Sequence, residues 1–214
     1  MNQNAIKVLL IEDNPADARL IEEMLGKVNG WPIELQWVRC LPDGLDKLRT
    51  GGLDGVLLDL SLPDRRGLDT FHRVHGDAPD VPIVVLTGME DEILALEALK
   101  AGAQDYLVKG QVSGRLLVRA IRYAIERKST EGELKKSIGK LRRVLFETVE
   151  SLASTVETRD PYTAGHQRRV AKLACAIARE MGLPDERVDG LRLAAMVHDV
   201  GKIHIPTEIL AKPG

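Results

Sequence analysis

Five short apolar segments, separated by amphipathic ones, occupy the first 125 residues and constrain the fold more than any other feature of the chain. Their length and aliphatic content are typical of strands that are buried on both faces of a parallel sheet. The segments are IKVLLI (6–11), IELQWV (33–38), GVLLDL (55–60), PIVVLT (82–87) and DYLV (105–108). Apolar spacing and capping residues predict intervening helices at about 15–27, 42–50, 65–75 and 90–101, and a fifth helix from about Ser113. The alternation predicts a doubly wound α/β fold around a five-stranded parallel sheet.

A long helical stretch follows the predicted sheet, from Ser113 to about residue 159. Within it, residues recur at alternating spacings of four and three, which is the seam pattern of a coiled coil: Leu134, Ile138, Leu141, Leu145, Thr148 and Leu152. Gly132 and Gly139 lower the helix propensity, so the pattern allows a break near 129–132. Two interpretations fit the seam: a homodimer through this helix, and an amphipathic helix that packs on its own domain.

Composition and charge exclude several classes of function. Aromatic residues make up 3% of the chain, which argues against an aromatic platform for nucleic acids. The 30 basic and 32 acidic residues nearly cancel, and the basic residues of the long helix are mixed with glutamates, so we expect no DNA partner. Cys40 and Cys175 are isolated, which favours a reduced, cytoplasmic compartment. No apolar run reaches the length of a membrane span, so we expect no membrane partner.

Polar side chains lie at the ends of four predicted strands. Strand 1 runs into Glu12 and Asp13, strand 3 into Asp59, strand 4 into Thr87 and strand 5 into Lys109. With strand order 2-1-3-4-5, the ligand site of such a sheet lies between strands 1 and 3, where the three carboxylates fall. Carboxylates that meet there repel one another unless a cation is bound, and oxygen ligands favour Mg²⁺. A carboxylate surrounded by Mg²⁺, lysine and hydroxyl is suited to accepting a phosphoryl group, although each residue taken singly could be a helix cap or a surface charge.

Four segments give this part of the chain a specific resemblance to the receiver domain of two-component response regulators: LLIEDNPADARLIEEML, DGVLLDLSLPDRRGLDT, PIVVLTG and AGAQDYLVKG. The resemblance covers about residues 5–126 and implies a sensor histidine kinase as the partner that donates the phosphoryl group. It implies a role for each site residue: Asp59 as phosphoacceptor and Mg²⁺ ligand, Glu12 and Asp13 as further Mg²⁺ ligands, Thr87 as switch hydroxyl, Lys109 as phosphoryl-binding lysine and Tyr106 as switch aromatic. Receivers often have proline after that lysine, whereas this chain has Gly110, a departure that concerns the last loop.

A histidine and an aspartate stand side by side in LRLAAMVHDV (191–200), which reads as a buried helix ended by Gly201. In the last turn of such a helix an imidazole is favourable, but Asp199 requires a cation, which is either Lys202 or a metal. His166 lies upstream in TRDPYTAGHQRRV, and with His198 and Asp199 it would form a donor set suited to Fe, Mn or Zn. On spacing alone, an ion pair between Asp199 and Lys202 with two polar helix-end histidines fits as well as a metal site.

The segments ETRDPYTAGHQRRV, AAMVHDVGKIHIP and ILAKPG resemble the opening third of an HD-GYP domain, a metal-dependent phosphohydrolase that degrades cyclic di-GMP. The resemblance implies that His166, His198 and Asp199 bind metal, that Lys202 contacts substrate phosphate, and that Arg169 is a weaker phosphate-binding candidate. The family pattern also requires later histidines, a later aspartate and the GYP segment, and the 15 residues after Asp199 (214 − 199) do not supply them. We therefore expect an incomplete metal site and no significant hydrolysis by these 214 residues.

Together these features predict a receiver domain at 1–126, a helical linker at 127–146 and a partial all-α HD-type domain at 147–214. The expected function is that of a response regulator in which phosphorylation controls a cyclic di-GMP phosphodiesterase. Two alternatives stay open at this point: a non-catalytic signalling or dimerisation module, and an HD phosphohydrolase that acts on another nucleotide.

Overall fold

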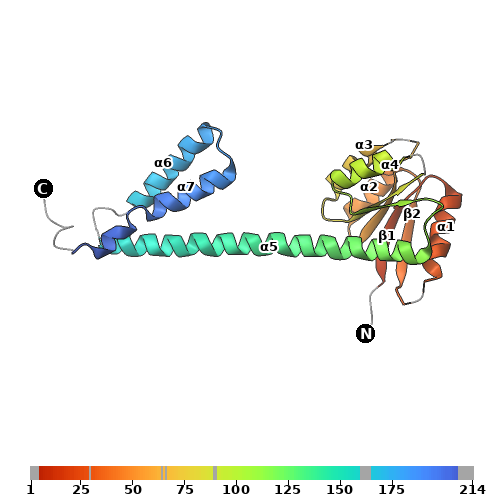
Figure 1. Cartoon of the computed structure of the whole chain (residues 1–214), viewed down its shortest axis with the longest axis horizontal. Coiled ribbons are helices and arrows are strands. Elements are labelled where there is room, and N and C mark those ends of the chain that lie inside the picture. Colours follow the sequence, from red (N-terminus) through yellow and green to blue (C-terminus); the bar gives the residue numbers. More distant parts are fainter. Residues whose placement is uncertain are drawn as a thin grey trace. The chain divides into compact units, whose positions relative to one another are not determined.

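The predicted sheet is present in the computed structural model, which describes residues 5–28, 30–63, 65, 67–88, 91–159 and 165–206 (Figure 1). The chain divides into two units, residues 1–134 and 135–214. The ILAKPG segment and the start of the helix expected at residue 90 lie outside the described residues.

Five parallel strands form one sheet in the first unit, in the order β2-β1-β3-β4-β5, which confirms the predicted fold class. The strands are β1 (Ile6–Ile11), β2 (Ile33–Val38), β3 (Gly55–Asp59), β4 (Ile83–Thr87) and β5 (Asp105–Val108). Every bound agrees with the sequence prediction to within one residue. Because Ile11 pairs with Leu58, the residues that follow them, Glu12 and Asp59, are neighbours at the carboxyl edge of the sheet.

Four helices connect the strands: α1 (Pro15–Gly26), α2 (Leu41–Thr50), α3 (Leu68–Asp77) and α4 (Glu92–Lys100). Asn14 caps α1 as its sequence predicts, since its side chain accepts a hydrogen bond from the Ala16 amide at 3.0 Å. The third helix begins three residues later than predicted because Gly67 precedes it with a φ of 74°. That left-handed conformation cannot continue a right-handed helix.

The sheet is covered on both faces, which explains the continuous apolar character of its strands (Figure 1). Alternate residues of β1 and β3 join different clusters: Val8, Leu10 and Leu57 pack with α1 and the start of the fifth helix. Leu9, Ile11 and Leu58 pack with α2 and α3. At the periphery of the first face, the Arg122 guanidinium lies 3.6 Å from the centroid of the Trp31 ring.

The fifth helix, α5, runs without a break from Gly114 to Arg159 over 46 residues. The break allowed near 129–132 is therefore wrong. Gly132 and Gly139 each lower helix stability by about 1 kcal/mol, which a long cooperative helix tolerates. The seam residues of α5 are largely exposed, with Leu134 at 60% and Leu141 at 71%.

In the second unit, α6 (His166–Glu180) and α7 (Asp185–Val197) form a hairpin that is followed by the 3₁₀ helix η2 (Val200–His204). Gly182 turns the hairpin with a φ of 72°, and the Leu183 amide donates to the Ala178 carbonyl at 3.0 Å. The predicted bounds of the last helix are wrong, because α7 ends at Val197 and Gly201 lies inside η2. His198 and Asp199 thus occupy the turn between the two elements.

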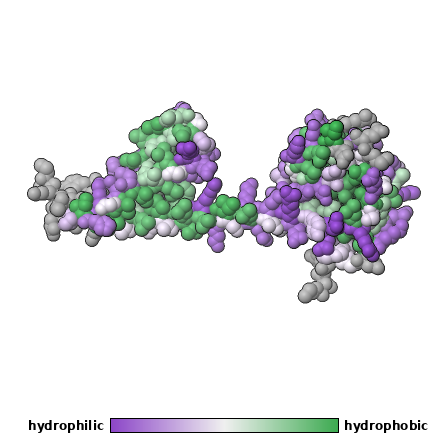
Figure 2. All heavy atoms as spheres, viewed as in Figure 1, coloured by the Kyte–Doolittle hydropathy of each residue, from purple (hydrophilic) through white to green (hydrophobic). Residues whose placement is uncertain are grey.

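Small side chains form the core of the second unit. Ala171, Ala195 and Met196 pack with Val149 of α5, and Cys175 and Ala178 pack with Val188. Hydrophobic residues also gather on the surface of the α6–α7 hairpin in Figure 2, and they include the exposed Leu173, Ile177 and Met181. Across the described ranges, no helix is long and apolar enough to cross a membrane.

Candidate functional site

Three carboxylates meet where β1 and β3 end. Glu12, Asp13 and Asp59 each present an oxygen within 4.8 Å of the others, so the structure brings the predicted acidic residues together. Glu12 is fully buried and Asp59 is 3% exposed, whereas Asp13 is accessible to solvent. The backbone fixes Glu12, because its amide donates to the Val38 carbonyl at 3.1 Å.

Lys109 places its ammonium among these carboxylates. It follows β5, and its amide donates to the Thr87 carbonyl at 2.8 Å, which directs the side chain across the sheet edge. The ammonium nitrogen Nζ lies 2.6 Å from Glu12 Oε2 and 2.7 Å from Asp59 Oδ2. The predicted lysine therefore bridges the two buried carboxylates.

The environment shifts the pKa of both Glu12 and Lys109. Burial raises the pKa of Glu12 to about 7, and the neighbouring Asp59 charge adds to this effect while Lys109 opposes it. Burial acts to lower the pKa of Lys109, but its hydrogen bonds to Asp59 and Glu12 outweigh burial and raise that pKa above its usual range. Lys109 is thus positively charged at every physiological pH, whereas Glu12 titrates near neutrality.

The remaining predicted residues, Thr87 and Tyr106, differ from Asp59 in their partners and burial. Asp59 Oδ1 accepts a hydrogen bond from the Ser61 amide at 2.9 Å. Thr87 is 1% exposed and donates its hydroxyl hydrogen to the Gly88 carbonyl at 3.2 Å. Tyr106 is half-buried and packs against the cluster that contains Leu9 and Phe71. Thr87 is the last residue of β4 and Tyr106 lies within β5, and a switching role for the two stays a prediction.

Gly110 follows Lys109 at the position where receivers often have proline, and its backbone conformation explains this difference. Its φ is 84°, a conformation that proline, with φ fixed near −65°, cannot adopt. The loop between β5 and α5 therefore has a different backbone path from one that contains proline at this position.

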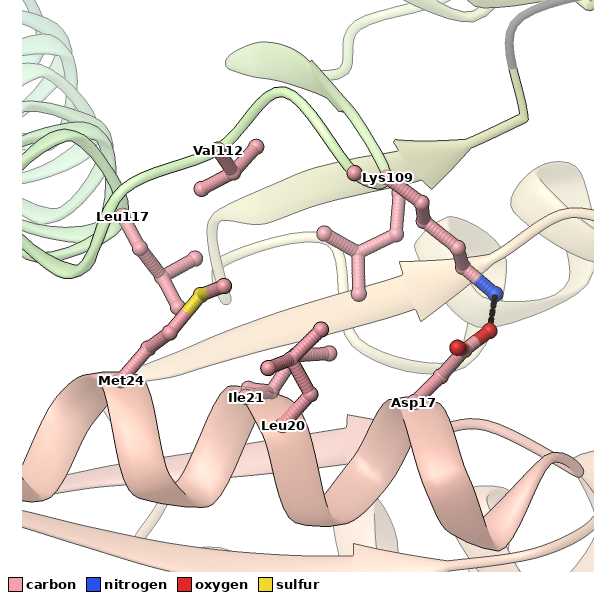
Figure 3. A pocket seen from close by; sticks show the side chains of 9 residues that line it. Asp17, Leu20, Ile21, Met24, Lys109, Val112 and Leu117 are labelled. Atoms are coloured by element: carbon pink, nitrogen blue, oxygen red, sulfur yellow. Dashed lines mark hydrogen bonds and ion pairs between the residues drawn. The ribbon is translucent and has the colours of Figure 1, made fainter.

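Asp17 is a site residue that the sequence reasoning missed. Its Oδ2 lies 3.2 Å from Lys109 Nζ, so a third carboxylate, beside those of Glu12 and Asp59, shares the same ammonium (Figure 3). The two side chains lie at one end of a small cavity that is otherwise lined by apolar residues, among them Ile21 and Leu117. A helix that begins at Pro15, directly after the acidic pair, puts its first turn at the same sheet edge, and this signal could have identified Asp17.

Trp37 is a second missed residue. Its indole Nε1 donates a hydrogen bond to the Glu12 carbonyl at 2.8 Å, which ties the acidic segment to the adjacent strand β2. Trp37 lies opposite Leu10 in the register of β1 and β2. Trp37 is 40% exposed, and its place one residue before the end of β2 puts it within reach of the residues that follow β1.

The donor set fits a hard divalent cation. Three carboxylates with one accessible member supply oxygen ligands and leave room for water, which is the coordination that Mg²⁺ prefers. Lys109 supplies one positive charge against four carboxylates, so the site retains a surplus of negative charge. The residues present are therefore compatible with Mg²⁺.

The second unit brings its predicted ligands together as well. His166, His198 and Asp199 each present a donor atom within 4.8 Å of the others, and the two imidazole centroids are 5.6 Å apart. His166 is the first residue of α6, while the other two occupy the turn after α7. Arg169 is exposed in the first turn of α6 and is not a member of this cluster.

Hydrogen bonds orient the turn residues of this cluster. His198 Nδ1 lies 2.8 Å from the Ala195 carbonyl, which can only accept, so Nδ1 carries the hydrogen. In the neutral ring, Nε2 then has a free lone pair, and it lies 3.5 Å from Asp199 Oδ2. Two electron-rich atoms facing each other favour a cation between them, and a backbone hydrogen bond of this kind is typical of metal-binding histidines.

Lys202 already supplies one such cation. Its Nζ donates to Asp199 Oδ2 at 2.8 Å, and this hydrogen bond lowers the pKa of Asp199, while burial opposes the shift. The ion pair that the sequence offered as an alternative to a metal site is thus present together with the clustered histidines. The two features do not exclude each other, since His166 and His198 remain beside the carboxylate.

The sheet order and the acidic site at its switch point define a receiver-type domain. The family model described as "Response regulator receiver domain" matches residues 8–122, more than half of the chain, and the chain belongs to this family. A second model, described as "HD domain", matches residues 163–214.

Two curated relatives match most of this chain. The "Cyclic di-GMP phosphodiesterase response regulator RpfG" of Xanthomonas campestris pv. campestris is 33% identical over 184 residues, which cover 80% of this chain and 49% of that protein. A "Cyclic di-GMP phosphodiesterase" of Thermotoga maritima is 33% identical over 180 residues, with 76% and 49% covered. The chain spans about half the length of these curated relatives.

Solved structures support the fold of the first unit. A response regulator receiver domain protein from Clostridium thermocellum is 28% identical, with a TM-score of 0.52 over 58% of this chain and 98% of that one. The signal receiver domain of an HD domain-containing protein from Pseudomonas fluorescens Pf-5 is 25% identical, with a TM-score of 0.54 over 62% and 96%.

The raised pKa of Glu12 predicts that Mg²⁺ affinity depends on pH. The metal-free protein holds a proton on Glu12 below about pH 7, and Mg²⁺ must displace that proton to gain a carboxylate ligand. We expect affinity to fall as the pH decreases through 7, by up to about tenfold per pH unit. Isothermal titration calorimetry at a series of pH values measures this, with Glu12→Gln as a control that binds weakly and lacks the dependence. Equal Mg²⁺ affinities of the wild type above and below pH 7 would contradict the role of Glu12 as a Mg²⁺ ligand.

Proposed function

We propose that the first unit accepts a phosphoryl group on Asp59 from a sensor histidine kinase and thereby regulates an HD-type output domain. The observation that carries this proposal is the position of Lys109 between Asp59 and Glu12, with distances of 2.7 and 2.6 Å. Membership of the receiver family supports it.

Asp59 is held in a geometry suited to accepting the group. The Ser61 amide holds Oδ1 and Lys109 holds Oδ2, so the carboxylate cannot rotate freely. In the proposed step, an oxygen of Asp59 forms a bond to phosphorus while the bond between phosphorus and the donor imidazole breaks, and the imidazole takes up a proton. Glu12, Asp13 and Asp59 would hold Mg²⁺, which would neutralise charge on the transferred oxygens. Lys109 stays paired throughout, because its charge faces the same oxygens.

The response to phosphorylation is proposed to involve Thr87 and Tyr106. The Thr87 hydroxyl now donates to the Gly88 carbonyl at 3.2 Å, which is near the long limit for such a bond. A phosphoryl oxygen on Asp59 is a stronger, charged acceptor, so the hydroxyl would change partners. Tyr106 is half-buried on β5 and would adjust to the space that Thr87 leaves.

For the second unit we propose a metal site with His166, His198 and Asp199 as ligands and Fe or Mn, or else Zn, as the ion. Lys202 would contact substrate phosphate once the metal replaces it as the partner of Asp199. The names of the relatives support cyclic di-GMP as the substrate of the whole protein. When bound, such an ion activates water for phosphodiester hydrolysis.

A non-catalytic signalling role is the second candidate for this unit, and the ion pair between Lys202 and Asp199 favours it.

We further propose that α5 mediates homodimerisation. Its seam residues Ile138, Leu145 and Leu152 are 47 to 49% exposed, although each is a large apolar side chain. A coiled-coil partner would bury this stripe, and a second copy of the same helix presents the same spacing. We propose a cytoplasmic location, which the proposed kinase partner favours, and Cys40 and Cys175 are not joined in a disulfide.

Phosphorylation is tested by incubating the chain with acetyl phosphate and Mg²⁺ and measuring phosphoryl incorporation by mass spectrometry. We expect incorporation in the wild type and only background in Asp59→Asn, because the acceptor oxygen is lost. Asp69→Asn is the matched control, since Asp69 is an exposed acid in the first turn of α3 and should leave incorporation unchanged. Equal incorporation in wild type and Asp59→Asn rejects the proposal.

Metal binding by the second unit is tested with Mn²⁺, which suits both donor sets. We expect two bound ions per chain in equilibrium dialysis. His198→Ala should remove one because it loses an imidazole ligand, and the double variant Glu12→Gln and Asp13→Asn should remove the other. If His198→Ala leaves the stoichiometry unchanged, the metal assignment is wrong and the signalling role is favoured. We expect no significant turnover of cyclic di-GMP by the 214-residue chain, because within its described residues the cluster provides three ligands.

Dimerisation is tested by sedimentation velocity at micromolar concentrations. Leu141→Lys places a charge in the seam and should convert a dimer to a monomer, with a loss of affinity of at least about tenfold. Glu147→Gln changes the net charge equally at an exposed position outside the seam and should leave the dimer intact. If the wild-type chain sediments as a monomer, the proposed homodimerisation through α5 is wrong.

A further inference from the structure

A cavity of about 320 Å³ lies between α5, α6 and α7 in the second unit. It is distinct in its lining from the histidine–aspartate cluster, because neither His166, His198 nor Asp199 lines it. Its floor is apolar and consists of the buried side chains of Ala171, Cys175 and Met196. Its rim is basic.

Three basic residues of the rim come from one face of α6. Arg168, Lys172 and Arg179 are four and seven residues apart, which at 3.6 residues per turn places them within about 40° around the helix. Like charges at this spacing destabilise a helix when nothing neutralises them. Repulsion among these three basic residues therefore lowers the stability of α6, and a bound anion would reduce that repulsion.

Helix α7 supplies a fourth cation to the lining of the cavity. Arg192 lines the cavity, and its guanidinium lies 5.1 Å from the centroid of the Phe146 ring of α5. A ring contact of this kind restrains the planar guanidinium and leaves its N–H groups available to an acceptor. Cations from two helices thus converge on one space.

The four cations make no ion pair with a carboxylate in the described part of the chain, although Glu150 also lines the cavity. Exposed basic residues elsewhere in the molecule do find partners, as Arg49 does with Asp46 and Asp77, and Arg127 with Glu131. With four bases against one acid, the lining carries an excess of three positive charges.

We propose that this cavity binds a small phosphorylated molecule of about the size of a nucleoside monophosphate. Guanidinium groups bind phosphate with paired, charge-assisted hydrogen bonds, which explains the basic rim. The apolar floor would accept the non-phosphate part of the ligand. The volume is at the lower end of the roughly 300–1,000 Å³ that small-molecule sites occupy, which excludes a long polyanion from the interior. This inference does not depend on phosphorylation of Asp59 or on a metal at His198.

The test compares adenosine 5′-monophosphate with adenosine, since the two probes differ only in the phosphate. Binding to the 214-residue chain is measured by calorimetry in the presence of EDTA, so that neither metal site contributes. We expect the monophosphate to bind and adenosine to bind at least about tenfold more weakly. The double variant Arg168→Gln and Lys172→Gln, and separately Arg192→Gln, should each weaken binding of the monophosphate by about tenfold or more.

The matched control is the double variant Lys140→Gln and Arg143→Gln, which removes the same charge from exposed positions of α5 that do not line the cavity. It should bind the monophosphate as the wild type does. All the substituted side chains are exposed, and circular dichroism checks that each variant is folded. Absence of binding, equal binding of the two probes, or an equal loss in the control variant would each overturn the proposal.

Discussion

The ammonium group of Lys109 is the interaction on which the carboxyl edge of the sheet depends. It contacts Glu12 after β1, Asp59 at the end of β3 and Asp17 in α1, and so it joins three elements that the chain brings together only on folding. Glu12 and Asp59 are buried, and burying a carboxylate without a partner is costly. One lysine offsets that cost only in part, because its single charge is shared among three carboxylates. The remaining negative charge is what gives the site affinity for a divalent cation, so the stability of this edge and its chemistry have the same origin.

The fold prepares this arrangement before any ligand binds. Parallel pairing of β1 with β3 sets the two acidic ends side by side, and pairing of β4 with β5 sets Thr87 opposite Val108, directly before Lys109. The strands can be apolar on both faces because helices cover both. The sheet interior therefore carries the stability, and the polar residues are confined to the positions where strands end. The second unit has a smaller core than the first, and alanines and one methionine make up much of it.

Much of the first unit follows from the sequence, because the local patterns and the tertiary structure agree there. Strand bounds were predictable from aliphatic runs, and the meeting of Glu12, Asp13 and Asp59 was predictable from the rule that ligands bind at the switch point of such sheets. Asp17 and Trp37 were not, since their roles depend on which way a side chain points once α1 and β2 are in place. The continuity of α5 through Gly132 and the early end of α7 reflect cooperativity and turn formation, which single-residue propensities do not capture. The cationic cavity combines residues of three helices, and the spacing along α6 alone would have indicated a solvated face.

The hydrogen bond between Trp37 and the Glu12 carbonyl also has a practical consequence. The chain contains two tryptophans, and they occupy unlike surroundings, since Trp31 lies under the Arg122 guanidinium whereas Trp37 is bonded to the backbone of the acidic segment. Indole emission responds to nearby charge. The molecule therefore carries an intrinsic fluorophore at its acidic centre and a second one, away from that centre, as an internal reference.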